Sequence, residues 1–248
     1  MKFVDIHSHI LPGIDDGPPS LEAALQMLRL AYRTGTRAMV ATPHMFMPPY
    51  NNCDRAAVSQ VFSATVQQLR QRQNDPGCAF LGDMSLHLGA ENYLSPEFLE
   101  ALEDGRVLSL NQGFYILVEF PAFLAFEMVV SAMERILASG RVPIMAHVER
   151  YPQFSERPEA LAHLLQMGCV AQLNGATVLS SRAHRKFALS LLRQGLIHVI
   201  ASDAHDSRVR APNLDKAFKV LKREFKEHQV NEWMFDNPRR ILANQSLI

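Results

Sequence analysis

Short apolar runs rich in β-branched residues alternate with stretches of helical periodicity along the whole of this 248-residue chain. Such alternation favours βα units arranged around a parallel sheet. It predicts seven strands, at residues 2–7, 37–41, 84–90, 114–119, 142–147, 169–173 and 197–202. Because no linker or low-complexity segment interrupts the pattern, we expect a single α/β domain over residues 1–248.

The predicted helices have recognisable ends. Ser20, Asp54 and Ser95 each stand directly before a helical stretch, where a side-chain oxygen can accept a hydrogen bond from an unpaired backbone N–H group. Glycine follows three later helical stretches just before a strand, at Gly140, Gly168 and Gly195. Glycine adopts the left-handed conformation that ends many helices, so these positions mark helix ends.

The composition excludes several kinds of partner. Lys plus Arg and Asp plus Glu both number 25, so no net field favours nucleic acid or an anionic membrane. No uncharged apolar run approaches about 18 residues, so we expect no membrane insertion. The three widely spaced cysteines, Cys53, Cys78 and Cys169, suit reduced thiols in a cytoplasmic protein better than a disulfide framework.

Every predicted strand ends in, or is closely followed by, a polar side chain. In chain order these side chains are His7 with His9, His44, Glu91, Glu119, His147, Asn174, and Asp203 with His205. Residues two apart on a strand share a face, so His7 and His9 can point toward one metal ion. In closed parallel βα barrels the carboxyl ends of the strands meet at one rim, where we expect these side chains to converge.

The remaining histidines provide an internal comparison. They lie within helical or strand patterns, away from the strand ends: His87, His163, His184, His198 and His228. We assign these five histidines no function.

Imidazole nitrogen and carboxylate oxygen form a donor set suited to zinc, manganese or iron. With Asp16, which follows the first strand, the candidate metal ligands are His7, His9, Asp16, His44, Glu91, Glu119, His147, Asp203 and His205. Nine ligands are too many for one ion, so they imply two or three. Three divalent ions would carry about +6 against about −4 from the four carboxylates, leaving a positive site that attracts phosphate.

Two arginines lie close to the predicted rim. Arg150 follows His147 by three positions, and Arg210 follows His205 by five, with Arg208 as an alternative to Arg210. Guanidinium groups bind phosphoryl oxygens in bidentate pairs. We expect Arg150 and Arg210 to contact phosphate, and the alternative for each is an ordinary surface ion pair.

Two apolar loops follow strands that carry candidate ligands, at residues 45–50 and 120–126. Apolar loops above a polar site can bind a phenyl ring of a substrate. The alternative is that they only cover the rim.

Other hydrolytic chemistries lack their sequence signatures. The chain has no Gly-x-Ser-x-Gly, no glycine-rich loop ending in Gly-Lys, and no Gly-x-Gly-x-x-Gly. No cysteine is followed six positions later by arginine, so the signature loop of cysteine-dependent phosphatases is excluded.

The order of the candidate ligands resembles that of the polymerase and histidinol phosphatase (PHP) superfamily: His7 and His9, then His44, His147, and Asp203 with His205. The closer resemblance is to the bacterial tyrosine-protein phosphatases of capsular polysaccharide operons, the CpsB/YwqE type. Four segments carry it: HSHILPGIDDG at 7–17, AHVERY at 146–151, VIASDAH at 199–205 and DNPR at 236–239.

This resemblance implies a distorted (β/α)7 TIM-like barrel, the PHP fold, with its metal site at the carboxyl ends of the strands. It implies three divalent metal ions, usually manganese, with iron or zinc as alternatives. The nine candidate ligands match family ligand positions, and Arg150 and Arg210 match its phosphate contacts. The implied activity is hydrolysis of phosphotyrosine on the tail of a partner tyrosine kinase that controls capsular or exopolysaccharide synthesis.

The sequence is also compatible with three rival functions. One is another PHP phosphoesterase, acting on histidinol phosphate or a nucleotide phosphate. A second is an amidohydrolase, but many of these bridge their metals with a carboxylated lysine, and no lysine stands near Glu119. A third is a non-catalytic regulator that binds a kinase tail.

Overall fold

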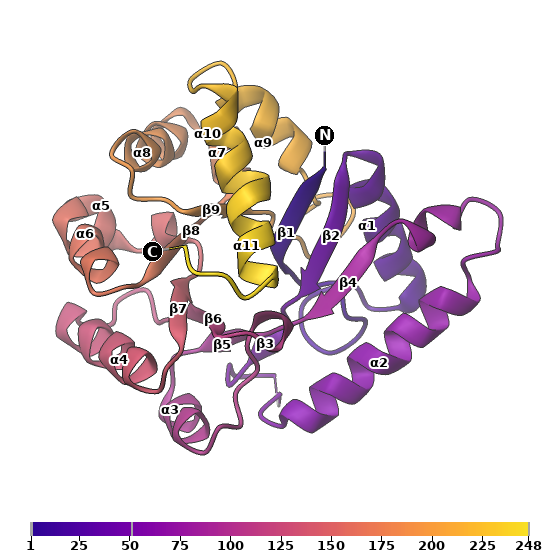
Figure 1. Cartoon of the computed structure of the whole chain (residues 1–248), viewed down its shortest axis with the longest axis horizontal. Helices are drawn as coiled ribbons and strands as arrows, with labels where there is room; N and C mark the ends of the chain where they lie inside the picture. Colours follow the sequence, from indigo (N-terminus) through magenta and orange to yellow (C-terminus); the bar gives the residue numbers. More distant parts are fainter. Residues whose placement is uncertain (1, 51, 248) are drawn as a thin grey trace.

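A computed structural model describes residues 2–50 and 52–247 of the chain. Its strands are all paired in parallel and form a curved sheet with helices around the outside (Figure 1). One part of the sheet has the order β1 (Phe3–Ser8), β2 (Thr36–Ala41), β4 (Ser85–Leu88). The other part has the order β3 (His44–Met45), β5 (Glu91–Tyr93), β6 (Tyr115–Glu119), β7 (Val142–Met145), β8 (Val170–Asn174), β9 (Val199–Ala201).

Backbone hydrogen bonds link the two parts of the sheet. Beyond β2 and β4, the N–H of Glu91 donates to the Pro43 carbonyl oxygen at 3.1 Å, so the pairing resumes in β3 and β5. On the other side, the N–H of His9 donates to Ala204 at 2.8 Å and that of Asp203 donates to His7 at 2.9 Å. The sheet therefore curls until β1 lies beside the chain that leaves β9.

Each of the seven predicted strand regions contains a strand, but the strand predicted at 142–147 ends at Met145, and two segments were not predicted. β3 and β5 are two and three residues long, too short for alternation of apolar and polar residues to be recognised in a sequence. The predicted strand at 84–90 also ends earlier, at Leu88. At Gly89 a Cβ atom would lie 2.6 Å from Leu110 Cδ2 and 3.1 Å from Val40 Cγ1, so the break between β4 and β5 is closely packed.

The eleven α-helices among the described residues are α1 (Leu21–Arg33), α2 (Arg55–Gln71), α3 (Pro96–Glu103), α4 (Phe126–Ala138), α5 (Pro152–Glu156), α6 (Pro158–Gln166), α7 (Gly175–Leu179), α8 (Arg182–Arg193), α9 (Leu214–Leu221), α10 (Glu227–Asn231) and α11 (Asn237–Leu242). Ser20, Asp54 and Ser95 are confirmed as N-caps, because their side chains accept hydrogen bonds from the first turns of α1, α2 and α3. The three glycines predicted to end helices have φ of +75°, +105° and +69°.

Two apolar clusters pack against the two faces of the curved sheet. The smaller lies inside the curved sheet and includes Val4, Ile6, Tyr115, Ile144 and Val199. Ile241 of α11 belongs to it, and α11 lies across the middle of the view in Figure 1. The larger cluster joins the outer face of the sheet to the surrounding helices. Burial of apolar surface on both faces of the sheet is the main source of stability in such a fold.

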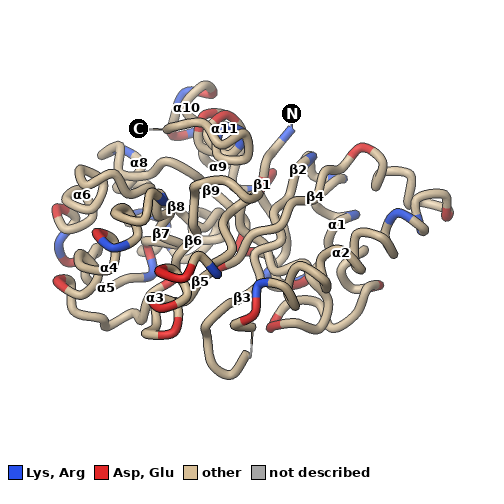
Figure 2. Tube along the Cα trace, turned by 60° about the horizontal axis from the view of Figure 1, so that its bottom comes forward, with Lys and Arg blue, Asp and Glu red and all other residues tan. Residues whose placement is uncertain are grey.

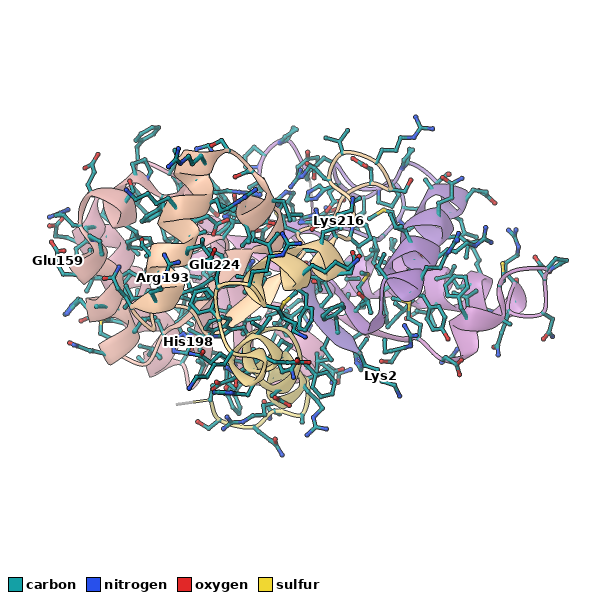
Figure 3. All side chains as sticks on the ribbon, turned by 90° about the horizontal axis from the view of Figure 1, so that it is seen from above. Lys2, Glu159, Arg193, His198, Lys216 and Glu224 are labelled. Carbon is teal, nitrogen blue, oxygen red and sulfur yellow. The ribbon has the colours of Figure 1, made fainter. Side chains whose placement is uncertain are left out.

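Charged side chains are spread over the outer helices, and neither sign covers a whole side of the molecule (Figure 2). Several form surface ion pairs, such as Arg193 with Glu224 at 2.6 Å (Figure 3). Exposed pairs of this kind contribute about 0–1 kcal/mol each. Among the residues described, no helix is long and apolar enough to cross a membrane.

The half-buried His198 (labelled in Figure 3) predicts a pH dependence of stability. Its Nδ1 accepts a hydrogen bond from the Ala171 N–H at 3.2 Å, and burial lowers the pKa of its imidazole. As the pH falls below about 6.5, the unfolded chain therefore binds a proton that the folded chain disfavours, and stability is lost. We expect His198→Asn, which keeps an acceptor but does not titrate, to lose less unfolding free energy than wild type between pH 7 and pH 5.

Urea unfolding at several pH values measures this difference. The matched control is His163→Asn on the exposed face of α6, which should follow the wild-type pH dependence. Equal pH dependence of wild type and His198→Asn would contradict the prediction.

Candidate metal centre

All nine predicted ligand residues lie in one cluster, and the donor atoms of eight of them form three overlapping groups. Within each group the donor atoms lie within 4.8 Å of one another: His7, His9, Glu91 and Asp203; His9, Asp16, His44 and His205; His44, Glu91 and Glu119. The remaining residue, His147, places its Nε2 3.0 Å from Glu91 Oε1 and 3.5 Å from Glu119 Oε1. Residues from β1, β3, β5 and β6 and from the turns after β7 and β9 thus meet in one place.

Hydrogen bonds orient the imidazoles at the centre of this cluster. His9 Nδ1 donates to Asp15 Oδ2 at 2.8 Å, and His205 Nδ1 donates to the carbonyl oxygen of Asp203 at 2.9 Å. An imidazole whose Nδ1 carries the proton offers the lone pair of its Nε2. Both Nε2 atoms face the cluster, where His205 Nε2 lies 3.3 Å from Asp16 Oδ1.

Several buried donor atoms lack the partners that a metal-free polar cluster would need. His44 Nδ1, Glu119 Oε2 and His205 Nε2 make no hydrogen bond of good geometry among residues 2–50 and 52–247, although His44 Nδ1 lies 3.2 Å from Glu91 Oε2 and His205 Nε2 lies 3.3 Å from Asp16 Oδ1. His7 Nε2 and His9 Nε2 face each other at 3.3 Å, and two nitrogen lone pairs so placed repel unless a proton or a metal ion lies between them. Unsatisfied buried atoms of this kind are uncommon in folded proteins, and the nitrogen and oxygen donors fit divalent metal ions.

The carboxylates of the cluster differ in charge state because their neighbours differ. Burial, aided by the negative charge of Glu91, raises the pKa of Glu119 to about 8. Burial also opposes the charge of Asp203, but the nearby His7 and Arg150 outweigh it and hold the pKa of that carboxyl below its usual range. The site therefore brings several carboxylates close together, and their neighbours stabilise the negative charge of Asp203 more than that of Glu119.

Two candidate ligands sit in a backbone conformation that L-residues rarely adopt. His147 has φ +32° and Asp203 has φ +52°. Strain of this kind costs about 1–3 kcal/mol per residue and persists only where the surroundings enforce it. Each of the two residues is the second one after a strand, β7 or β9, and its side chain belongs to the cluster.

The loop after β1 folds back onto the strand that precedes it. Asp15 Oδ1 accepts from the N–H of Gly17 at 3.0 Å, and Asp15 Oδ2 accepts from the N–H of His44 at 3.1 Å. At Gly17 a Cβ atom would lie 2.3 Å from the carbonyl oxygen of His9. Only glycine fits this close approach, which brings Asp16 to the cluster.

Both predicted arginines reach the cluster. Arg150 hydrogen-bonds to Asp203 Oδ2, and Arg210 donates to Asp16 Oδ2 at 3.0 Å and to Asp203 Oδ1 at 3.2 Å. Arg208, the alternative, is exposed and does not line the cavity beside the cluster. Asp206 accepts hydrogen bonds from the backbone N–H groups of residues 208–210, and this turn brings Arg210 inward.

A cavity of about 290 Å³ opens beside the candidate ligands and the two arginines. Its apolar wall consists of Met47, Pro48, Pro49 and Tyr50. The Tyr50 ring stacks on the His44 ring, with 5.5 Å between the ring centroids and 4° between the ring planes. The first predicted apolar loop therefore borders the cavity.

The second predicted apolar loop, 120–126, does not line this cavity. Phe120 is buried against Tyr151 at 3.8 Å, while Phe123 is 90% exposed. The prediction for this loop is wrong with respect to the cavity, because its first aromatic side chain packs into the core.

Sequence reasoning missed two residues that orient the candidate ligands. Asp15 belongs to the segment 7–17 and was not among the candidate ligands, yet it contacts His9 and the backbone of His44. Gln172 was treated as part of a strand, yet it is fully buried and contacts His7 and His147. A polar residue within the otherwise apolar run 169–173 was the available signal.

Asn174 was recognised at a strand end but given no role. Its Nδ2 donates to Asp203 Oδ2 at 2.8 Å, while its Oδ1 accepts from the N–H of Ala176 at the start of α7. The five histidines assigned no function belong to none of the three donor groups of the described residues.

The comparisons with known proteins agree with this geometry. The family model described as capsular polysaccharide synthesis, CpsB/CapC, matches residues 3–243. The chain belongs to the CpsB/CapC family. Its relatives include tyrosine-protein phosphatase YwqE of Bacillus subtilis, 32% identical over 99% of this chain and 93% of that protein. Tyrosine-protein phosphatase CpsB of Streptococcus agalactiae serotype III is 30% identical over 98% of this chain and 99% of that protein.

This CpsB/CapC chain also resembles solved structures. It superimposes with a TM-score of 0.89 and 30% identity on a structure from work on YwqE of Bacillus subtilis and CpsB of Streptococcus pneumoniae, described as unique metal-dependent tyrosine phosphatases. That match covers 100% of this chain and 96% of the other. A phosphotriesterase from Mycobacterium tuberculosis matches with a TM-score of 0.59 and 14% identity over 98% of this chain and 94% of that chain, which shows a shared fold.

Substitution of Gly17 tests the loop that carries Asp15 and Asp16. In Gly17→Ala the new Cβ would meet the His9 carbonyl oxygen at 2.3 Å, so the loop must move away from the cluster. We expect Mn²⁺ affinity, measured by calorimetry, to fall by about 10-fold or more, as for loss of a group that orients a ligand.

The control is Gly105→Ala, because a Cβ there meets nothing within 4 Å although φ is +67°. It should lose roughly 1 kcal/mol of stability from backbone strain and bind Mn²⁺ as the wild type does. Unchanged Mn²⁺ affinity in Gly17→Ala would contradict the prediction.

Proposed function

We propose that this CpsB/CapC chain is a metal-dependent protein-tyrosine phosphatase. The observation that carries the proposal is the convergence of three overlapping nitrogen and oxygen donor groups with two arginines at one cavity. The names of the relatives YwqE and CpsB support the same activity. The described residues that line the cavity include no cysteine, which supports chemistry that does not depend on a thiolate.

The metal-binding part of the proposal follows the three donor groups. His7, His9, Glu91 and Asp203 would hold one ion, and Asp16, His44 and His205 a second. Glu119 of the third group, together with His147, which lies beside Glu91 and Glu119, would hold a third. Manganese is the preferred metal, with iron or zinc as alternatives. When bound, divalent ions supply Lewis-acid polarisation of the phosphate ester.

The protein's own side chains bind and orient the substrate. Arg150 and Arg210 now contact Asp203 and Asp16, and each presents further N–H groups at the cavity. These groups can bind the phosphoryl oxygens and stabilise their developing charge. A divalent ion held by Asp203 and Asp16 would compensate these carboxylates in place of the guanidiniums, which could then pair with phosphate.

The wall beside the phosphate position suits an aryl ester. Met47 and Tyr50 provide apolar surface for a phenyl ring next to the arginines. A phenolate leaves more readily than an alkoxide, so an aryl phosphate needs less protonation of its leaving group. This favours phosphotyrosine over histidinol phosphate or a nucleotide phosphate.

The finer structural points belong to the same proposal. We count β2 with β3 and β4 with β5 as single interrupted strands, because their pairing resumes in register after each break; this makes a distorted (β/α)7 barrel. The metal site then lies at the carboxyl ends of its strands. The match of the family model over residues 3–243 supports one domain for residues 1–248.

The biological setting is proposed from the family. We propose as substrate the phosphotyrosine-bearing tail of a bacterial tyrosine kinase that controls capsule or exopolysaccharide synthesis. The family description, capsular polysaccharide synthesis, supports the second part of this proposal. Unpaired Cys53, Cys78 and Cys169 support a cytoplasmic location.

Metal removal tests the activity. Chelated and dialysed protein should lose hydrolysis of a phosphotyrosine peptide, and added Mn²⁺ should restore it, because the donor groups act only when loaded. His147→Ala should lose more than about 100-fold in rate, since even an outer-shell partner is worth about 10- to 100-fold. The control His163→Ala should keep the wild-type rate.

Two other outcomes would decide against the proposal. Full activity of metal-free protein would refute metal dependence. Tight binding of the phosphopeptide in Mn²⁺ without release of phosphate would favour the non-catalytic regulator instead.

The two arginines on the loop after β9 give a matched comparison. We expect Arg210→Ala to lower kcat/KM for a phosphotyrosine peptide by about 10²- to 10³-fold, the usual cost of removing one donor to a developing oxyanion. Arg208→Ala should stay close to wild type, because Arg208 is exposed and outside the cavity. Equal losses in both variants would refute the assignment of Arg210.

A further inference from the structure

We infer that Gln172 is a positioning residue that orients two metal ligands from different strands, an inference that rests on the proposed function. Gln172 lies in β8, is fully buried, and does not line the cavity. It therefore acts through His7 and His147 and has no contact with substrate.

The contact with His147 determines which way the amide group of Gln172 points. The backbone N–H of His147 lies 2.9 Å from Gln172 Oε1. A backbone N–H can only donate, so the atom that it meets must be the amide oxygen. This removes the usual ambiguity between the oxygen and nitrogen of a glutamine side chain.

The same oxygen determines how His7 is protonated. His7 Nδ1 lies 3.1 Å from Gln172 Oε1, which can only accept, so Nδ1 must carry a proton. The lone pair available for metal binding is then on His7 Nε2. This atom lies 3.3 Å from Glu91 Oε2 and 3.4 Å from Asp203 Oδ1, within the first donor group.

The bond to His147 also stabilises a strained backbone. His147 has φ +32°, and its N–H has Gln172 as its acceptor in this conformation. One side chain on β8 thus holds the imidazole of β1 and the turn after β7 at the same time. Outer-shell groups that do this orient ligands and raise metal affinity.

The two halves of the Gln172 amide have different surroundings. Its Nε2 is buried and has no hydrogen-bond partner in the described part of the chain. An unsatisfied buried donor costs about 1–3 kcal/mol, which offsets part of what the two hydrogen bonds to Oε1 contribute. The contacts of Gln172 with other polar groups of the described residues are therefore those that its oxygen makes with His7 and His147.

Calorimetric titration of Mn²⁺ into metal-free variants tests the inference without any activity measurement. Gln172→Leu keeps the approximate shape but removes the acceptor, and we expect Mn²⁺ affinity to fall by about 10- to 100-fold. Gln172→Glu keeps an acceptor oxygen and should recover most of that affinity. In steady-state kinetics with an aryl phosphate, Gln172→Leu should lower kcat at fixed Mn²⁺ and leave KM unchanged.

The matched control is Asn237→Leu. Asn237 is also a buried amide, which donates from Nδ2 at 2.9 Å to the carbonyl oxygen of His198, just before β9 and thus at the opposite end of that strand from Asp203 and His205. It should lower the melting temperature and leave Mn²⁺ affinity unchanged. An equal loss of affinity in Asn237→Leu would show a general effect of stability and overturn the inference.

Two further outcomes would also overturn it: wild-type Mn²⁺ affinity in Gln172→Leu, or no recovery in Gln172→Glu. If Gln172→Leu does not fold, Gln172→Glu decides, since near-native affinity supports the inference and a 10-fold loss overturns it. Wild-type protein that binds no Mn²⁺ would refute the proposed function itself, a result distinct from a difference between variants.

Discussion

Four carboxylates and five imidazoles share one largely buried cluster, and the balance of charge among them governs the rest of the structure. Glu91 is almost fully buried and contacts four of the histidines, so its negative charge depends on positive neighbours. Uncompensated buried charge is expensive, which is why Arg150 and Arg210 turn toward Asp203 and Asp16. A divalent ion would supply the same compensation at closer range.

The fold accommodates this cluster through local departures from regular structure. The breaks after β2 and β4, the close approach at Gly17, and the left-handed residues His147 and Asp203 all occur where a strand gives way to a loop. The interior of the sheet below is filled by Val4, Ile6 and other apolar side chains. A well-packed core can hold a few strained positions that carry the chemistry.

The sequence was sufficient for the strand–helix alternation, the helix caps and the meeting of the nine candidate ligands, because each rests on short-range periodicity or on position relative to a strand end. It was insufficient where the answer depends on contacts between distant segments. Gln172 meets His7 across 165 positions, and no local pattern reports such a contact. Of Arg208 and Arg210, only Arg210 reaches the cavity, and the turn that Asp206 forms with the backbone of residues 208–210 decides this.

The short segments failed for a different reason. β3 and β5 exist because their neighbours continue to pair with them, and two or three residues carry no recognisable alternation. Phe120 follows β6 as Met47 follows β3, yet Phe120 packs against Tyr151 while Met47 lines the cavity. Which apolar side chain faces a cavity and which faces the core is settled by tertiary packing.

Glu91 belongs to two of the three donor groups, His9 and His44 also belong to two, and this overlap has a thermodynamic consequence. Sites that share ligands cannot fill independently, since an ion that takes one oxygen of Glu91 changes the charge and orientation available to the next. Occupancy of such a centre is a property of the whole set, with coupling free energies between sites that are reciprocal. A form with one or two ions would then differ from the fully loaded form in the orientation and charge of the shared ligands as well as in the number of ions.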